Sequence, residues 1–419
     1  MEDGRIGTRP FVLLLVAWAV FRGAQLSILG TGFGYDPNIY LSYARSWGAG
    51  AAPYAAFHPE YPPGALLLFI VPFLAGGFQY VAPFQAEMAI FDAVTFALVF
   101  AFARRLWPGD TVRQIVVAVG YLVATAVLHP VLYWRYDLAP AALTLGALYL
   151  ATTGRDSASA FCLGLSAAVK LWPAGLAPLW IGASARRKGW RGALRDAAWI
   201  AVGLALPALP FVSRAGLGIF GFLQFQSERA LQLESVWANL ALLLDAGRVS
   251  ATRITYDHNA FNVRGGSAGA LLAASRIAVL VLTLAPQAMA LRRRLAGAPE
   301  LPMRMWVDAA TATVLGLLIG SSVLSPQFMI WLVPLLVLTG VPGIAAAIGL
   351  AAFTTAIYPA LYDPLVSRQP PGYGVALACL SARNLLLVVA YAMLVRRLGR
   401  DAPRNTVHSG KSDIAPAAT

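Results

Sequence analysis

Apolar runs long enough to cross a membrane recur along most of this chain. Of its 419 residues, 58% are hydrophobic and only 12% are charged. A bilayer offers no water to backbone N–H and C=O groups, so a crossing segment must be a helix or part of a closed barrel. The runs are rich in Leu, Ala, Val and Gly and lack the alternation of barrel strands. They predict an all-α, polytopic bundle of transmembrane helices.

The basic residues lie mostly in short loops between these runs. The formal net charge is +13, which in a soluble protein would suggest a nucleic-acid partner. Here the main basic clusters lie at 104–105, 186–188, 292–294 and 396–397. Lys and Arg in short loops mark the cytoplasmic side of a membrane protein. We therefore predict a multi-pass protein of the plasma (inner) membrane, with these loops in the cytoplasm and no nucleic-acid partner.

The runs divide the chain into about 12 predicted spans, with both termini in the cytoplasm. Residues 1–400 are predicted to form one transmembrane domain and residues 401–419 a disordered cytoplasmic tail. The predicted outer loops lie near 31–63, 131–137, 214–267 and 361–373. A surface helix is expected over 224–237, inside the third of these loops.

The order of crossings between residues 64 and 181 stays open. Two full crossings at 64–80 and 85–103 would place the arginines at 104–105 outside, whereas a partly re-entrant first segment keeps them inside. The charge rule favours the second arrangement. We also interpret 157–183 as two short helices that meet near the outer face at Lys170.

Two kinds of side chain inside the runs need comment. Arg22 lies within the first run, and a lipid-facing arginine is costly, so it is expected to face the protein or a wet cavity. Cys162 and Cys379 both lie in apolar runs. We interpret them as packing residues that form neither a disulfide framework nor a metal site.

The stretch 34–63 is polar, aromatic and rich in Pro and Gly, and it follows the first apolar run. Asp36 stands directly before Pro37, so it is a candidate N-cap with Pro at the first helical position. The same carboxylate is a candidate general base, and position alone does not choose between the two roles. Tyr40, one helical turn later, lies on the apolar face of the predicted helix.

Charged side chains converge on the predicted outer face. They are Asp36, Glu60, Arg135, Asp137, Lys170, Glu228, Arg229, Glu234 and His258. A carboxylate there can act as a general base, and a second carboxylate with Arg and Lys nearby can hold a phosphate, directly or through a cation. Transfer from a lipid phosphate to a hydroxyl group needs these two functions.

Plainer interpretations stand beside these roles. Glu60 is also a candidate cap of the next helix, Arg135 and Asp137 are a candidate interfacial ion pair, and Lys170 is a candidate snorkelling residue. Glu228 with Arg229 is a candidate surface pair, and His258 a simple loop residue. The four histidines are scattered, so no metal site and no cofactor are predicted, although a divalent cation is left open.

Several motifs follow one another in an order that resembles one family. They are Asp36-x3-Tyr40, Gly50-x2-Pro53-Tyr54, Glu60-Tyr-Pro-Pro63, Arg135-x-Asp137, Ala167-Ala-Val-Lys170-x-Trp-Pro173, Gln232-x-Glu234-Ser235-x-Trp237 and Ser325-Pro-Gln-Phe-x-x-Trp331. Over roughly residues 10–395, their order is similar to the GT-C superfamily of polytopic membrane glycosyltransferases. Within it they most resemble the actinobacterial branch that uses polyprenyl-phosphate sugars, which includes the alpha-mannosyltransferase of phosphatidylinositol mannoside synthesis.

The resemblance implies an inverting transfer at the outer membrane face. A hexose, mannose in this branch, would pass from a polyprenyl-phosphate donor in the lipid bilayer to a glycolipid or cell-wall glycan acceptor. By similarity, Asp36 would be the general base, Arg135 and Asp137 would lie in a second outer loop, and Lys170 would reach the donor phosphate. From their predicted outer position we add as candidate substrate-binding residues Glu60, Tyr40, Arg229, Glu234 and His258.

The late Ser-Pro motif departs from the pattern of the branch. Its mannosyltransferases carry a histidine pair after this Ser-Pro, whereas here Gln327 follows Pro326 and no histidine is present. We assign Gln327 part of that substrate-binding role. Two alternatives remain: a transferase for another sugar such as arabinofuranose, and a transporter or flippase of a lipid-linked sugar.

Overall fold

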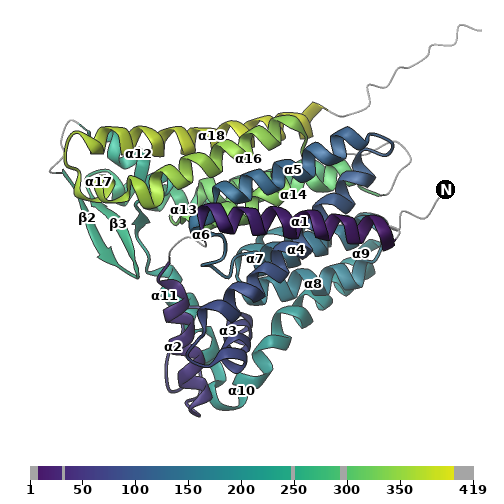
Figure 1. Ribbon diagram of the computed structural model, residues 1–419, viewed down its shortest axis with the longest axis horizontal. Coiled ribbons are helices and arrows are strands. Elements are labelled where there is room, and N and C mark those ends of the chain that lie inside the picture. Colours follow the sequence, from purple (N-terminus) through teal and green to yellow (C-terminus); the bar gives the residue numbers. More distant parts are fainter. Residues whose placement is uncertain (1–7, 31–33, 247–250, 293–299, 401–419) are drawn as a thin grey trace, which may run out of the picture.

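The computed structural model describes residues 8–30, 34–246, 251–292 and 300–400. The predicted tail at 401–419 and two arginines of the 292–294 cluster lie outside these residues. The described chain forms a bundle of long helices, and α1 begins and α18 ends on the same side of it, opposite the hairpin of β2 and β3 (Figure 1).

Most of the chain is in long or apolar helices. They are α1 (Thr8–Leu29), α3 (Pro63–Gly76), α4 (Val81–Leu106), α5 (Thr111–Val127), α7 (Leu138–Thr152), α8 (Asp156–Val169), α9 (Ala177–Ala205), α13 (Ala268–Arg292), α14 (Met303–Gly320), α15 (Met329–Val337), α16 (Val341–Thr355) and α18 (Gly372–Arg400). Seven helical segments are long and apolar enough to cross a membrane, and five apolar helices are shorter. The expected all-α polytopic fold is confirmed.

Shorter elements connect the long helices and form the site. They are α2 (Asp36–Gly48), α6 (His129–Leu132), η1 (Trp172–Leu176), η2 (Leu206–Ala208), α10 (Leu209–Ala215), η3 (Gly216–Phe220), α11 (Gly221–Ser227), α12 (Val236–Leu244), η5 (Pro326–Phe328), η6 (Ala356–Ala360) and α17 (Tyr362–Ser367). Three short strands, β1 (Leu231–Gln232), β2 (Thr252–Asp257) and β3 (Ala260–Gly265), form one small antiparallel sheet in the order β1-β3-β2.

The first ambiguous region contains one short helix and one long one. Helix α3 has 14 residues, which span roughly 21 Å and fall short of a hydrocarbon core of about 30 Å. Helix α4 has 26 residues and is long enough to cross. The pattern agrees with the arrangement that the charge rule favours, in which only the second segment crosses.

Arginines from three of the predicted cytoplasmic clusters lie at one end of the bundle: Arg105, Arg186 and Arg397. The Arg105 guanidinium donates to the carbonyl of Thr152 at the end of α7, at 2.8 Å. Arg186 donates to the carbonyl of Leu291 at the end of α13, at 2.7 Å. Arg397, near the end of α18, pairs with Asp308 in the first turns of α14. Cations at helix C-termini complement the carbonyl end of the helix dipole, and together these contacts tie several helices at one face.

The predicted break at Lys170 is present. Helix α8 ends at Val169, Lys170 is extended with φ −154° and ψ 137°, and η1 begins at Trp172. Pro173 near the start of η1 suits a new helical turn, because the missing N–H of proline is not needed there. Helix α9 contains a second break at Gly189, whose φ of 68° and ψ of −167° suit glycine.

The predicted surface helix over 224–237 is wrong as one continuous element. Helix α11 ends at Ser227, Leu231 pairs with Val263 as part of β1, and α12 begins after Ser235. The Ser235 hydroxyl accepts the backbone N–H of Ala238 at 3.0 Å, which caps α12. Serine stabilises a helix more as its N-cap than at an interior position. In the segment before Ser235, pairing of β1 with β3 provides hydrogen-bond partners for the backbone N–H and C=O groups.

Arg22 faces the protein, as expected. Its side chain donates to both carboxylate oxygens of Asp92 on α4, at 2.7 and 3.0 Å, and to the hydroxyl of Thr125 on α5. Arg22 is 3% exposed and Asp92 is fully buried. The hydroxyl groups of Tyr121 and Tyr133 also donate to Asp92. A buried ion pair with this many hydrogen bonds fixes α1 against α4 and α5.

Candidate active site

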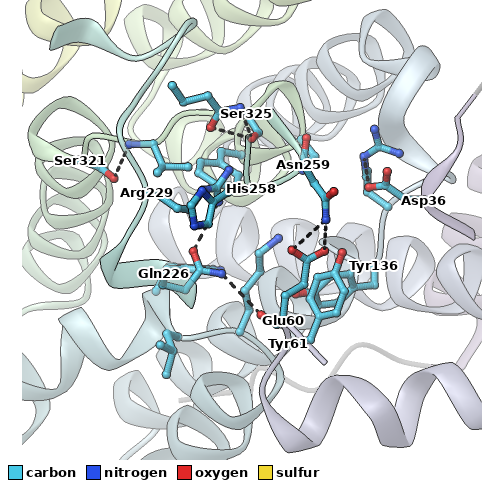
Figure 2. A pocket seen from close by; sticks show the side chains of 18 of the residues that line it. Asp36, Glu60, Tyr61, Tyr136, Gln226, Arg229, His258, Asn259, Ser321 and Ser325 are labelled. Atoms are coloured by element: carbon cyan, nitrogen blue, oxygen red, sulfur yellow. Dashed lines mark hydrogen bonds and ion pairs between the residues drawn. The ribbon is translucent and has the colours of Figure 1, made fainter. Parts of the chain in front are cut away.

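One cavity of about 650 Å³ opens at the end of the bundle opposite Arg105, Arg186 and Arg397. Its walls come from the start of α2, the residues just before α3, the helix break after α8 and the connection from α14 to α15. Residues of α11, β1 and the β2–β3 hairpin complete them (Figure 2). Seven of the ten candidate site residues from the sequence line it: Asp36, Glu60, Arg135, Lys170, Arg229, His258 and Gln327. Tyr40, Asp137 and Glu234 are not part of the lining.

Asp36 lies on the cavity wall and does not cap its helix. Tyr35 occupies the N-cap position of α2, which makes Asp36 the first helical residue, and no side chain bonds to the first-turn N–H groups. The Asp36 carboxylate instead forms an ion pair with the Nε of Arg135, at 2.8 Å, drawn in Figure 2. It also accepts a long hydrogen bond from the Tyr40 hydroxyl at 3.4 Å. The N-cap interpretation of Asp36 is therefore wrong.

Two opposing effects act on the Asp36 carboxyl. Burial raises its pKa, because a low-dielectric environment disfavours the charged form, and the Arg135 guanidinium opposes that rise. The balance leaves the pKa above the ordinary value for aspartate. A general base is most effective when its pKa approaches the working pH, and burial moves the pKa of Asp36 in that direction.

Tyr40 lies behind Asp36, away from the cavity. Its ring is 1% exposed and stacks on Phe69 of α3, with centroids 4.2 Å apart. It meets the edge of Tyr136 at 5.6 Å. Ring pairs of this kind hold α2 firmly against α3 and the 133–137 turn. The structure therefore places Tyr40 as a support of Asp36.

The candidate ion pair between Arg135 and Asp137 is wrong, because each residue has a different partner. Arg135 pairs with Asp36, whereas Asp137 accepts from the Nζ of Lys170 at 2.7 Å. The Asp137 side chain is fully buried and that of Lys170 is 18% exposed. The buried Asp137 carboxylate therefore holds the Lys170 ammonium group at the cavity, and Lys170 does not snorkel toward a membrane surface.

Glu60 is also part of the cavity wall. Its carboxylate accepts from the Nδ2 of Asn259 at 3.4 Å, and its backbone carbonyl from Gln226 at 3.5 Å (Figure 2). Burial raises the pKa of the Glu60 carboxyl, while its hydrogen bonds and the charge of Arg229 oppose the rise. The interpretation of Glu60 as a helix cap is wrong, since Pro62 precedes α3 and no side-chain cap is formed.

The turn between β2 and β3 brings His258 and Asn259 into the cavity lining. Both have left-handed backbone angles, with φ of 50° and 56°, as the two central residues of a tight hairpin require. The His258 ring contacts Asp257 at 3.1 Å and Glu228 at 3.6 Å. Within the described residues, no group of three or more His, Cys, Asp or Glu side chains is placed to hold a metal ion.

Glu234 lies outside the cavity in a second, fully buried ion pair. Its carboxylate accepts from Arg383 of α18 at 2.7 Å, and Arg383 is not exposed at all. Burial raises the pKa of Glu234, and Arg383 opposes this. The pair fixes the residues that follow β1 to α18. Gln232 of β1 lines the cavity and its side chain bonds to Ser325 at 2.9 Å. The structure therefore places Glu234 in a supporting position.

Some lining residues were not among the candidates from the sequence. They are mostly aromatic or neutral polar: Tyr35, Tyr61, Tyr136, Trp172, Gln226, Gln232, Tyr256, Asn259, Ser321, Ser325, Trp331 and Tyr358. Charge was the signal that found the others, and these residues carry none. The Asp-His-Asn turn and the motif around Trp331 were signals that pointed to some of them.

Comparison with known proteins identifies the family. The model of glycosyltransferase family 87 matches residues 57–319, which is more than half of the chain. The chain belongs to glycosyltransferase family 87. It is therefore an enzyme, a glycosyltransferase, and its membrane-length apolar helices make it a multi-pass membrane protein. The matched stretch includes Glu60, Arg135, Lys170, Arg229 and the hairpin, while Asp36 and Gln327 lie outside it.

No curated protein sequence matches the chain. Among solved structures, the chain is similar to ArnT from Cupriavidus metallidurans bound to undecaprenyl phosphate, with 17% identity and a TM-score of 0.48 over 94% of this chain and 77% of that one. It is also similar to the same protein in the apo state, with 16% identity and a TM-score of 0.46 over 93% and 77%.

Proposed function

We propose that this glycosyltransferase moves a hexose, with inversion, from a polyprenyl-phosphate donor to a hydroxyl group of a glycolipid or cell-wall glycan. One observation carries the proposal. A single cavity contains a carboxylate of raised pKa, Asp36, together with three basic side chains, Arg135, Lys170 and Arg229. A base for the acceptor and positive charge for a leaving phosphate are the two groups that this reaction needs.

The proposed step is a direct displacement at the anomeric carbon. Asp36 takes the proton of the acceptor hydroxyl, and the acceptor oxygen forms the new bond to C1 from the face opposite the phosphate. The bond between C1 and the phosphate oxygen breaks, and its electron pair leaves with the polyprenyl phosphate. Arg135 and Lys170 stabilise the negative charge of that leaving group. Asp36 then returns the proton to water.

A lipid donor suits the remaining lining. Part of the cavity wall is apolar, from Leu171, Phe222, Leu317 and Leu318, and lies beside the basic residues. A polyprenyl phosphate combines an apolar chain with an anionic head, and this wall offers surface for both. We place Arg229 and His258 with the sugar and phosphate, and Glu60 and Gln327 with sugar hydroxyl groups.

We place the cavity on the extracytoplasmic face of the plasma membrane and both termini in the cytoplasm. The described basic residues Arg105, Arg186 and Arg397 gather at the other end of the bundle, where the charge rule expects the cytoplasm. Residues 1–400 then form one catalytic transmembrane domain. A donor carried by a membrane lipid can reach such a site without any nucleotide sugar.

The sugar and the reaction class are tested together. Purified protein is incubated with labelled polyprenyl-phosphate mannose or polyprenyl-phosphate arabinofuranose and a membrane lipid extract. We expect transfer of mannose and a product with the anomeric configuration opposite to that of the donor. Transfer of arabinofuranose alone would contradict the assignment of the sugar. Movement of the intact donor from one leaflet of a proteoliposome membrane to the other, without any sugar transfer, would favour a flippase and contradict the proposal.

A further inference from the structure

The ammonium group of Lys170 sits in a cage of three aromatic rings. Its Nζ lies 4.6 Å from the ring centroid of Tyr136, 5.1 Å from that of Trp331 and 5.3 Å from that of Phe328. Asp137 accepts one of its N–H groups at 2.7 Å. Rings at these distances attract a cation through their negative faces. The cage and Asp137 together hold the ammonium group at the edge of the cavity that Lys170 lines.

Trp331 contributes to this arrangement twice. Its ring is one wall of the cage, and its indole Nε1 donates to the same Asp137 oxygen that holds Lys170, at 2.5 Å. The ring itself is fixed in a stack, 4.0 Å from Phe328 and 5.0 Å from Trp172, and the residue is only 4% exposed. A buried side chain stacked against two aromatic neighbours has little freedom to turn, so it offers the N–H in one direction.

Asp137 has few other constraints. Its second oxygen is buried and makes no hydrogen bond to any described residue. Without the indole N–H, Lys170 would be the one hydrogen-bond donor that the described chain supplies to this carboxylate. A lysine has a flexible four-carbon stem and three rotatable donors, so it cannot fix a carboxylate as well as a stacked indole can.

We propose that Trp331 is a positioning residue: it fixes Asp137, and through Asp137 and the aromatic cage it holds the Lys170 ammonium in place for the phosphate of the donor. The inference rests on the proposed function, which assigns Lys170 to that phosphate. Its physical basis is pre-organisation, since a cation already held in its binding position loses less freedom when the ligand arrives.

The test compares two lipids that differ by one phosphate group. Undecaprenyl phosphate and undecaprenol are titrated separately into detergent-purified protein, and the ratio of their affinities is measured. Wild type is expected to prefer the phosphate, and Lys170→Met to reduce this preference, with Arg135 and Arg229 retaining part of it. Trp331→Phe keeps a ring in the stack but deletes the N–H, and it is expected to reduce the preference on the order of tenfold, with undecaprenol affinity unchanged.

Two further variants separate positioning from packing. Trp306→Phe also replaces a buried tryptophan, one that packs on Trp180 away from the cavity lining, and it should retain the wild-type ratio. Phe328→Leu removes one wall of the cage at a half-buried position, and it should lower the ratio even if Trp331→Phe fails to fold.

The outcomes are distinct. If wild type binds both lipids equally, the proposed phosphate site fails and this inference fails with it. If wild type prefers the phosphate, Lys170→Met reduces the preference, and folded Trp331→Phe or Phe328→Leu retains the full wild-type ratio, then the donor site stands and the positioning role of Trp331 is overturned.

Discussion

At the scale of single residues, Asp36 is the position on which the proposed reaction depends most. Asp36 does not cap α2, and its carboxylate forms an ion pair with Arg135 in the wall of the cavity. Asp36→Asn preserves size and should leave folding intact, judged by monodisperse elution. The amide cannot accept the proton of the acceptor, so transfer should fall by on the order of 10²–10⁴-fold. Near wild-type transfer by the variant would move the search for the base to Glu60 or Asp137.

The raised pKa of Asp36 predicts the shape of the pH profile. A general base works in its deprotonated form, so transfer is retained above its pKa and declines as the pH falls through it. Because burial raises the pKa, the decline should begin at higher pH than the ordinary aspartate value of about 3.9 would give. Initial rates at low acceptor concentration, measured between about pH 4 and 8, test this.

A matched variant checks that Asp36 is the group observed. The Arg135 charge lowers the pKa of Asp36, so Arg135→Gln should move the acid limb to higher pH, in addition to weakening donor binding. Glu60 repels the charged form of Asp36, so Glu60→Gln should move that limb in the opposite direction, to lower pH. A wild-type rate that stays flat down to about pH 4 would exclude a base of raised pKa.

Individual site residues were predictable where charge marked them, but their partners were not. Arg135 and Asp137 are two positions apart, which suggests a local pair. In the structure their partners come from segments far away in the chain, Asp36 for Arg135 and Lys170 for Asp137. The partners are about 100 residues apart in the first pair and 33 in the second. Such pairing depends on how the helices pack, and the pattern of a single sequence does not specify that packing.

At the scale of elements, the β2–β3 hairpin is the part of the site that sequence patterns described least well. Its turn needs left-handed backbone angles at two non-glycine residues, and asparagine tolerates these better than most residues do. The sequence predicts one surface helix over residues 224–237, inside the 214–267 loop. Pairing of β1 with β3 and the Ser235 cap divide that segment instead.

Two substitutions of Asn259 distinguish its role in the hairpin turn from its hydrogen bond to Glu60. Asn259→Gly keeps the backbone angles available and deletes the Nδ2 contact with Glu60, so thermal stability should be nearly unchanged while the acceptor KM rises. Asn259→Val deletes the same contact and also disfavours the left-handed angle, so it should lower stability by about 1–2 kcal/mol.

Melting curves and acceptor titrations of both Asn259 variants decide the point. Equal stability of the glycine and valine variants would contradict the strained turn. An unchanged acceptor KM in both variants would remove the hairpin tip from the acceptor site. His258→Gly serves as the comparison, because it relaxes the neighbouring turn residue without touching the contact between Asn259 and Glu60.

At the scale of the whole molecule, the fold class followed from the sequence with little ambiguity. Membrane-length apolar runs leave few alternatives, and the break at Lys170 was marked by a charged residue close to Pro173. What the pattern could not supply was the interior polar network. Asp92 lies in an apolar run without any signal of its partners, yet it binds Arg22, Tyr121 and Tyr133 from three other segments.

The orientation of the molecule in the membrane is the last prediction. Asp137 is fully buried and would be a poor labelling site, so exposed positions are needed at each end. Tyr256 lines the cavity and is 65% exposed, and Arg113, just beyond the basic end of α4, has a side chain that is 51% exposed. In a background without Cys162 and Cys379, Tyr256→Cys should react with an impermeant maleimide in intact cells. Arg113→Cys should react only after permeabilisation. The reverse pattern would place the cavity in the cytoplasm, against the side that the charge rule assigns to Arg105 and Arg397, and would require a donor presented on the inner leaflet.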